Sequence, residues 1–501
     1  MFHKTSARHR LASFAAGIAA IASVLVALPP TPAMAASDEA RVVDHYVLER
    51  MAQVARVRVI VVARNSVNLL EGDLHRAGVM YPLRVPIAHG FSAELTAGQI
   101  HSLARNPDVE RLVYDAPVRL TDTAIDASAL ATAYPRVVAA ASLWSNPIAP
   151  LTGNGVGVAV IDSGITAHPD FNSRILVNQD FNPTVADAND AYGHGTAVSG
   201  IIAGDGNASS RSYVGIAPQA NLINLRVNDG SGAAPTSTIM NAILWAVNNR
   251  AAYNIRVINL SLSSSVQESY LTSPIDAAVE YAWLKGIVVV VAAGNQGPNS
   301  ALYAPANDPF VITVGATDDG GTAAVADDTL ASFSSFGTTQ DGFSKPDMVA
   351  PGRHIITTLA ANSNFALNYP TYAVGSQYIR LSGTSMATPI VSGVAALYIE
   401  TNPTVRPGQL KALLLATAQP LSFVGAGAGY PDAGRATGYT GLLGNANHGI
   451  DPNNYLKVMY MQANSLLTLP AVSWDTVSWD SVSWSSVSWD SLAWNAVSWG
   501  S

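Results

Sequence analysis

The sequence contains no cysteine and few charged residues. Among its 501 residues there is no Cys, which excludes disulfides, thiolate nucleophiles and thiolate metal ligands. Charged residues make up 12% of the chain, about half of the share that is usual in soluble proteins. The net charge of −8 is spread along the chain without a basic stripe. We therefore expect neither nucleic acid nor an anionic membrane surface among its partners.

Long apolar runs are also scarce, apart from one near the N-terminus. There a basic stretch (MFHKTSARHR) precedes an apolar one (LASFAAGIAAIASVLVAL), and a proline-containing stretch leads to the small-residue site Ala33-Met34-Ala35. This layout is typical of a signal peptide over residues 1–35. The apolar stretch is also long enough to cross a bilayer, so an uncleaved anchor is the alternative. We expect a secreted or cell-surface-associated protein with no membrane span after removal of the signal.

Two hydrophobic patterns divide the rest of the chain. Residues 56–120 alternate short apolar runs with amphipathic stretches in the order strand, helix, strand, strand, helix, strand, which predicts a small ferredoxin-like α+β unit. Residues 140–420 carry continuous β-branched runs, such as VGVAVID and IVVVVAAG, separated by helical stretches. Such runs predict an α/β fold with a mostly parallel sheet that has helices on both faces. The polar stretch from Thr121 to Thr132 is predicted to be a linker.

Four polar residues stand beside glycines where the predicted sheet would expose them. Asp162 ends VGVAVID, His194 stands in YGHGTAVSG, Asn295 follows IVVVVAAG, and Ser385 stands in LSGTSMATP, where Pro389 is expected in the first turn of a helix. In open parallel sheets, reactive groups collect at the carboxyl ends of the strands. A hydroxyl nucleophile, a base, a carboxylate that orients the base and an amide donor are the parts needed for acyl transfer.

The motifs DSG, GHGT, AAGN and GTSMATP, in this order, resemble the four signatures of the subtilisin-like serine proteases. The resemblance implies a subtilisin-like fold over residues 140–420 and hydrolysis of proteins or peptides through an acyl-enzyme. It implies that Asp162 orients His194, that His194 is general base and then acid, and that Ser385 is the nucleophile. Asn295 and the Ser385 amide would form the oxyanion hole. This chemistry requires no cofactor.

The same resemblance suggests substrate-binding positions. Ser261-Leu262-Ser263 resembles the Ser-Leu-Gly pocket wall of the family, and the segment with Gly230 and Gly232 resembles the edge on which an extended substrate pairs. A serine in place of glycine at 263 would narrow the pocket for the residue before the cut bond. The alternative is that these are ordinary loop positions.

Calcium is a further expectation from the family. Asp170 and the Asp205-Gly206-Asn207 loop offer oxygen ligands for a structural ion. However, no acidic loop with regular ligand spacing is present, and polar turns have the same composition. A calcium site at Asp170 and a set of polar turns are therefore both open.

Residues 56–120 also resemble the inhibitor-type pro-domain of the family, most clearly in HGFSAEL and LARNPDVERLVYD. A pro-domain of this kind assists folding and then stays bound as an inhibitor. We therefore expect a zymogen that cleaves itself between Asp115 and Thr132. The alternative is a permanent accessory domain.

Six of the nine tryptophans stand at every fifth position from Trp474 to Trp499. Residues 421–470 are assigned to a C-terminal extension and residues 471–501 to this repeat tail. A five-residue step fits neither a helix nor a straight strand, and Asp-Thr or Asp-Ser between VSW units predicts corners. The tail could dock on the protease domain, bind a cell-wall or glycan surface, or be a low-complexity chain.

The main prediction is therefore a secreted, self-processed serine endopeptidase. The alternative is a cell-surface binding protein in which the Trp-repeat tail is the main functional part.

Overall fold

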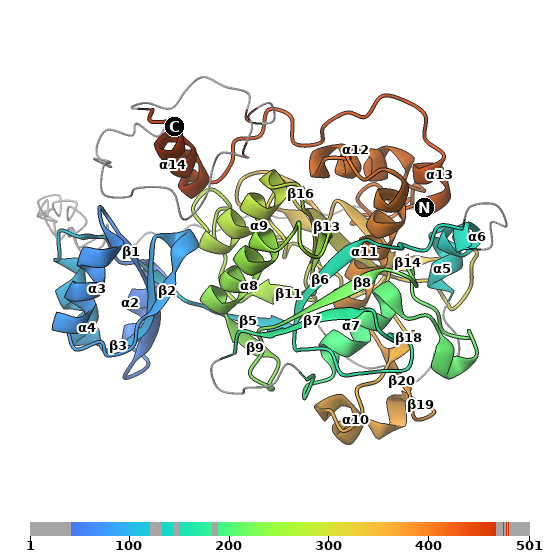
Figure 1. The fold of residues 1–501 in the computed structure, drawn as a ribbon, viewed down its shortest axis with the longest axis horizontal. Helices are drawn as coiled ribbons and strands as arrows, with labels where there is room; N and C mark the ends of the chain where they lie inside the picture. Colours follow the sequence, from blue (N-terminus) through green and yellow to red (C-terminus); the bar gives the residue numbers. More distant parts are fainter. Residues whose placement is uncertain are drawn as a thin grey trace, which may run out of the picture.

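The computed structural model describes residues 42–120, 133–144, 150–182 and 189–466, together with Trp474, Val477 and Trp479. The predicted signal peptide, the linker at 121–132 and the rest of the repeat tail lie outside the described residues. Figure 1 shows a small N-terminal unit, in blue, beside a larger part that is built around a central sheet.

The N-terminal unit is an antiparallel sheet with three α-helices and one 3₁₀ helix. Its elements are α2 (His45–Met51), β1 (Val57–Ala63), α3 (Val67–Arg76), β2 (Leu83–Val85), the short 3₁₀ helix η1 (Pro86–Ala88), β3 (Gly90–Leu95), α4 (Ala97–Ala104) and β4 (Val109–Tyr114). The strands lie in the order β2-β3-β1-β4. Ser66 and Thr96 cap the N-termini of α3 and α4 with side-chain oxygens. The succession βαββαβ confirms the predicted ferredoxin-like unit.

The larger part is built on a parallel sheet. Its neighbouring strands are β7 (Ile175–Asp180), β8 (Asn221–Arg226), β6 (Gly157–Asp162), β10 (Ile255–Leu260), β12 (Val288–Ala292), β13 (Ile312–Asp318) and β17 (Met348–Pro351), and all of these pairs are parallel. The short β14 (Thr329–Leu330) pairs antiparallel with β13. All residues of β6 and β12 are buried, as expected for a sheet that is covered on both faces. The predicted α/β fold is confirmed.

Two pairs of helices pack on this sheet (Figure 1). α7 (His194–Ala203) packs on α11 (Thr384–Thr401), and α8 (Thr236–Asn248) packs on α9 (Pro274–Leu284). The remaining helices are α5 (Tyr134–Val137), α6 (Ala140–Trp144), η2 (Asn207–Ser209), α10 (Asn364–Asn368), η3 (Pro370–Tyr372), α12 (Pro407–Thr417), α13 (Ala433–Thr437) and α14 (Asn454–Ala463). No helix in the described ranges is long and apolar enough to cross a membrane.

Three small sheets complete the fold. β5 (Pro117–Leu120) lies between β11 (Leu262–Ser264) and β9 (Ala233–Pro235), β20 (Tyr378–Leu381) lies between β18 (Ile355–Thr358) and β19 (Ala373–Val374), and β15 (Gly337–Thr338) pairs with β16 (Ser344–Lys345). The first of these sheets joins the two parts of the molecule, because β5 follows the N-terminal unit whereas β9 and β11 belong to the larger part.

One face of the N-terminal sheet is packed against the larger part. Ile60, Val62 and Val113 are buried in the same hydrophobic cluster as the residues of the parallel sheet. The η1 helix contacts both α8 and α9. The N-terminal unit is therefore docked through apolar side chains as well as through β5.

Candidate active site

Asp162 and His194 meet at the carboxyl edge of the parallel sheet. Asp162 is the last residue of β6, and His194 is the first residue of α7. The Nδ1 atom of His194 lies 2.8 Å from Oδ1 of Asp162, and both side chains are buried. The backbone N–H of Ser163 donates to the same Oδ1 at 2.7 Å. Because a carboxylate only accepts hydrogen bonds, this contact places the ring proton on Nδ1 and makes Nε2 the basic nitrogen.

The glycines of the GHGT motif allow this close approach. Gly193 has a φ of 106°, a left-handed conformation that strains other residues. A Cβ atom on Gly195 would lie 2.2 Å from the backbone oxygen of Gly164. The first turn of α7 can therefore lie directly against the end of β6 only with glycine at both positions.

A buried carboxylate that sequence reasoning missed, Asp190, supports the same turn. It accepts hydrogen bonds from the backbone N–H groups of Gly193 at 2.6 Å and Thr196 at 2.8 Å, and from Oγ of Ser163 at 2.7 Å. Burial raises the pKa of Asp190, although these hydrogen bonds oppose the shift. Asp190 thus ties the start of α7 to the residue after Asp162. Its only signal in the sequence is an acidic residue in a turn just before His194.

Ser385 is the second residue of α11 and is fully buried. Its Oγ atom donates to the backbone oxygen of Ser261 at 3.3 Å, and Oγ of Ser261 donates to the backbone oxygen of Ser385 at 3.0 Å. The helix begins at Thr384, so the expectation that Pro389 lies in its first turn is wrong. Pro389 has no N–H to bond the Ser385 carbonyl four residues earlier. The hydroxyl of Ser261 takes the place of that missing donor.

Asn295 is held beside the start of α11 by Thr384, the residue before Ser385. The backbone N–H and the hydroxyl of Thr384 donate to Oδ1 of Asn295 at 3.0 and 3.1 Å. Because the acceptor end of the amide is turned toward Thr384, its NH₂ end faces away from that residue. This orientation suits a donor to the oxygen of a tetrahedral intermediate at Ser385.

One family of known proteins is similar to more than half of this chain. The model of the subtilase family matches residues 153–446. This chain belongs to the subtilase family. It is 41% identical over 335 residues to serine protease AprX of Bacillus subtilis (strain 168), and the alignment covers 64% of this chain and 72% of that protein.

Two further relatives show the extent of the similarity. Subtilisin Savinase of Lederbergia lenta is 38% identical over 271 residues, which cover 54% of this chain and 86% of the relative. Fervidolysin from Fervidobacterium pennivorans, described as a keratinolytic enzyme related to subtilisin, superimposes with a TM-score of 0.61 at 23% sequence identity. That superposition covers 78% of this chain and 61% of fervidolysin. The chain is a subtilisin-like serine peptidase, and the N-terminal α+β unit is consistent with the pro-domain of a subtilase.

In this subtilase, the predicted substrate-binding segment pairs with the chain's own strand β5. The strand β5 pairs antiparallel with β11, with Leu120 opposite Leu262 and Arg119 opposite Ser263. Ser261, which precedes β11, is the residue that contacts Ser385. Of the three predicted wall residues, Leu262 and Ser263 therefore pair with β5, and Ser261 contacts Ser385.

The opposite side of β5 pairs with β9, whose residues sequence reasoning missed. Pro117 lies opposite Pro235 and Arg119 opposite Ala233. The predicted residues Gly230 and Gly232 lie in the loop just before β9, and both have a φ of 89°. The sequence Ala-Ala-Pro carries no glycine or family-like signal that could have identified it as the pairing strand.

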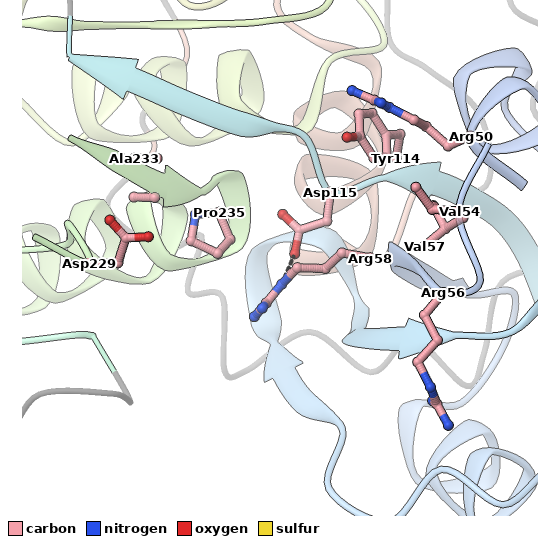
Figure 2. Close-up of a pocket in the computed structure, with 11 residues that line it drawn as sticks. Arg50, Val54, Arg56, Val57, Arg58, Tyr114, Asp115, Asp229, Ala233 and Pro235 are labelled. Atoms are coloured by element: carbon pink, nitrogen blue, oxygen red, sulfur yellow. Dashed lines mark hydrogen bonds and ion pairs between the residues drawn. The ribbon is translucent and has the colours of Figure 1, made fainter. Parts of the chain in front are cut away.

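Asp115 joins the N-terminal unit to the subtilase domain. Its buried carboxylate accepts hydrogen bonds from Nε of Arg58 at 3.1 Å, Oγ of Ser92 at 2.6 Å, and the backbone N–H and Oγ of Ser237 at 3.1 and 2.8 Å. Figure 2 shows Asp115 pointing to Arg58, with Pro235 on the other side of the junction. Ser237 lies in the first turn of α8, where the helix dipole favours a negative charge.

The residues around Asp170 do not fit a calcium site. The two carboxylate oxygens of Asp170 accept hydrogen bonds from the backbone N–H of Ala208 at 2.7 Å and from the hydroxyl of Tyr378 at 2.8 Å. The guanidinium group of Arg174 lies 3.8 Å from Asp205 and donates to the backbone oxygen of Ala203 at 2.6 Å. A calcium ion needs six to eight oxygen ligands, and a guanidinium group repels it. Within the described residues, no cluster of three or more acidic or histidine side chains is placed to hold a metal.

Proposed function

We propose that this subtilase is a secreted endopeptidase that acts through Asp162, His194 and Ser385 and is made as a self-processed zymogen. The catalytic roles are supported best by the 2.8 Å contact between Nδ1 of His194 and Oδ1 of Asp162 at the carboxyl edge of the parallel sheet. Ser385 lies at the same edge, because its Oγ atom donates to the backbone oxygen of Ser261, which directly follows β10. The proposal of secretion rests on the sequence of residues 1–35.

The proposed reaction begins when Oγ of Ser385 attacks the carbonyl carbon of the scissile peptide bond. The hydroxyl proton passes to Nε2 of His194, and Asp162 stabilises the resulting imidazolium. The amide of Asn295 and the N–H of Ser385 donate to the negatively charged oxygen of the tetrahedral intermediate. His194 then protonates the leaving amine, and a water molecule hydrolyses the acyl-enzyme by the same proton transfers.

The nucleophile is tested by the variant Ser385→Ala. We expect it to abolish the hydrolysis of casein, whereas the wild type should be active and should be inhibited by a serine-directed phosphonate. Circular dichroism of the two proteins checks that the variant is folded. Equal turnover by the two folded proteins would exclude Ser385 as the nucleophile.

We further propose that residues 56–120 are an inhibitory pro-domain and that cleavage follows β5. This strand is held between two strands of the substrate edge, as an extended substrate would be. Its C-terminal end, Leu120, leads toward Ser261, which contacts the nucleophile. The first peptide bonds after β5, Leu120–Thr121 and Thr121–Asp122, are therefore the proposed processing sites.

N-terminal sequencing of the secreted protein tests this processing. The wild-type chain should begin at Thr121 or Asp122, and the chain with Ser385→Ala should retain residues 56–120. A mature chain that still contains β1 to β4 in covalent linkage would favour the permanent accessory domain instead. The same cleavage in the Ser385→Ala chain would show that another protease processes it.

Other assignments stay predictions. These are the divisions at 1–35, 56–120, 140–420, 421–470 and 471–501, and a cell-wall or glycan partner for the tail. The family match to residues 153–446 extends into the segment assigned to the C-terminal extension. We propose that the catalytic chemistry uses no cofactor, because the reaction needs only the side chains and backbone amides named above.

A further inference from the structure

Two tryptophans of the repeat tail lie against the protease domain. The side chains of Trp474 and Trp479 are only 8% and 4% exposed. Val477, between them in sequence, packs against the same core cluster. Trp474 and Trp479 are one repeat apart, so the contact uses two consecutive copies of the unit.

The groove that receives them, called here the Trp groove, is formed by segments that are far apart in sequence. It is lined by Trp283, Leu284, Lys285 and Gly286 at the C-terminal end of α9, by Phe310, by Arg406, Pro407 and Gly408 at the start of α12, and by Asn445 and Asn447. A hydrogen bond of 3.0 Å from Nε1 of Trp283 to Oδ1 of Asn447 holds two of these segments together. All of the lining apart from the tail residues lies in the subtilase domain and the segment that follows it.

Tyr460 of α14 contacts both tryptophans. Its ring centre lies 5.3 Å from that of Trp474, with an interplanar angle of 82°, and 5.4 Å from that of Trp479. The two tryptophan rings are 6.1 Å apart. These separations lie in the range in which aromatic rings attract each other. The ring of Tyr460 thus packs against two tryptophans, and a single tryptophan would make only part of this contact.

A backbone contact adds a positional constraint. Nζ of Lys285 donates to the carbonyl oxygen of Trp479. Lys285 caps the C-terminal end of α9, so its position is set by the helix. The groove therefore contacts the main chain of the tail at one point and two indole rings at others, which makes the spacing between the rings important.

The helix α14 is also fixed to α9 at its other end. Oε2 of Glu280 accepts a hydrogen bond from the backbone N–H of Asn453 at 2.7 Å, and Nδ2 of Asn453 donates to the backbone oxygen of Ser273 at 2.9 Å. The tail contacts lie near the opposite end of α14, at Tyr460. Tail docking would therefore hold both ends of α14 against the protease domain.

We propose that the Trp groove is a binding site for the pentapeptide repeat, that it recognises two tryptophans five residues apart, and that Trp474 and Trp479 of the same chain occupy it. The sequence VSWDTVSWDS supplies this pair, and the remaining four copies of the unit are not needed to fill the site. The proposal does not depend on the catalytic roles given above.

The occupants are tested in the full-length Ser385→Ala chain, which avoids self-digestion. Trp474→Ala/Trp479→Ala should raise amide hydrogen exchange in α14 and at the C-terminal end of α9 by at least about ten-fold. The matched control Trp489→Ala/Trp494→Ala removes two tryptophans with the same spacing from later copies and should leave this exchange unchanged. Similar exchange in the two double variants would overturn the assignment of the occupants.

Recognition itself is tested with peptides. The full-length Ser385→Ala chain with all six tail tryptophans changed to Ala should bind the peptide VSWDTVSWDS with one peptide per chain, measured by calorimetry. A peptide with one inserted residue, VSWDTAVSWDS, should bind at least about ten-fold more weakly, which corresponds to about 1.4 kcal/mol. Tyr460→Ala in the same chain should abolish binding of the first peptide. Failure of VSWDTVSWDS to bind, or equal binding of the two peptides, would overturn the proposal.

Discussion

At the scale of single residues, Asn295 shows how the orientation of a side chain depends on its neighbour. Thr384 donates twice to Oδ1 of Asn295 and so determines which end of the amide can act as donor. The AAGN motif identified Asn295 in the sequence. The role of Thr384 could not be predicted, because it rests on a contact between residues 89 positions apart.

Asn295→Ala should therefore reduce catalysis without abolishing it. We expect kcat to fall by about 100-fold to 1000-fold, the loss known for the corresponding donor of subtilisin, with little change in KM. The donor acts mainly on the tetrahedral oxygen, so substrate binding should be nearly unaffected. Steady-state kinetics with a chromogenic peptide measures both constants. A loss as complete as that of Ser385→Ala would contradict this role.

At the scale of elements, runs of apolar residues predicted the fully buried strands of the parallel sheet. The runs VGVAVID and IVVVVAAG correspond to β6 and β12. The run RVINLSL has the same apolar character, but there the chain forms β10 and β11 on either side of Ser261. This break places Ser261 beside Ser385. The pattern of apolar residues cannot reveal this break, because the residues directly before and after Ser261 are equally buried.

The site was predictable to the extent that its residues lie in short motifs. Asp162, His194 and Ser385 each carry a local signature. Asp190 does not, because its link to the residue after Asp162 is a contact with Ser163, which only the fold brings close to it. The β9 strand was missed for the same reason, since its pairing partner is a distant segment of the chain.

A double-mutant cycle can test whether the hydroxyl of Ser261 replaces the backbone N–H that Pro389 lacks. In the Ser385→Ala chain, Ser261→Ala should lower the free energy of unfolding by about 1–3 kcal/mol, because it leaves the buried carbonyl of residue 385 without a donor. Adding Pro389→Ala supplies a helical N–H to that carbonyl and should recover part of the loss. Denaturant unfolding of the single and double variants measures the coupling. If the changes in the free energy of unfolding were strictly additive, Ser261 would not replace the missing donor.

At the scale of the whole molecule, three buried carboxyl groups lie close to one another. Asp276 and Glu280 belong to α9, Asp308 lies in a loop, and all three are 0% exposed. Burial raises the pKa of Asp308 to about 7 and raises the pKa values of Asp276 and Glu280 well above their usual range. The molecule therefore carries acidic groups that are easiest to bury when they are protonated.

Stability should consequently depend on pH through Asp308. An unfolded Asp loses its proton near pH 4, whereas folded Asp308 keeps it up to about pH 7. Between these values the folded chain binds the extra proton, so its stability falls as the pH rises, by about 1.4 kcal/mol per pH unit for this group. Above that window the contribution is constant.

The variant Asp308→Asn, made in the Ser385→Ala chain, should reduce the fall of stability with pH by about 1.4 kcal/mol per pH unit, because an amide does not titrate in the same range. Denaturant unfolding at several pH values between 4.5 and 6.5 compares the two proteins. The exposed Asp327→Asn serves as control and should keep the pH dependence of the parent. An unchanged slope in Asp308→Asn would show that Asp308 is not the group responsible.

Arg174, which lies beside Asp170, affects how the protein responds to a low concentration of metal ions. A bound ion leaves its site when the ion is diluted, but the positive charge of Arg174 is attached to the backbone and cannot diffuse away. Its hydrogen bonds to the carbonyl oxygens of Ala203 and Ala220 do not require a free cation. The loop that follows α7 should therefore keep its conformation in dilute or chelating media, and so should the C-terminal end of α7 that it holds.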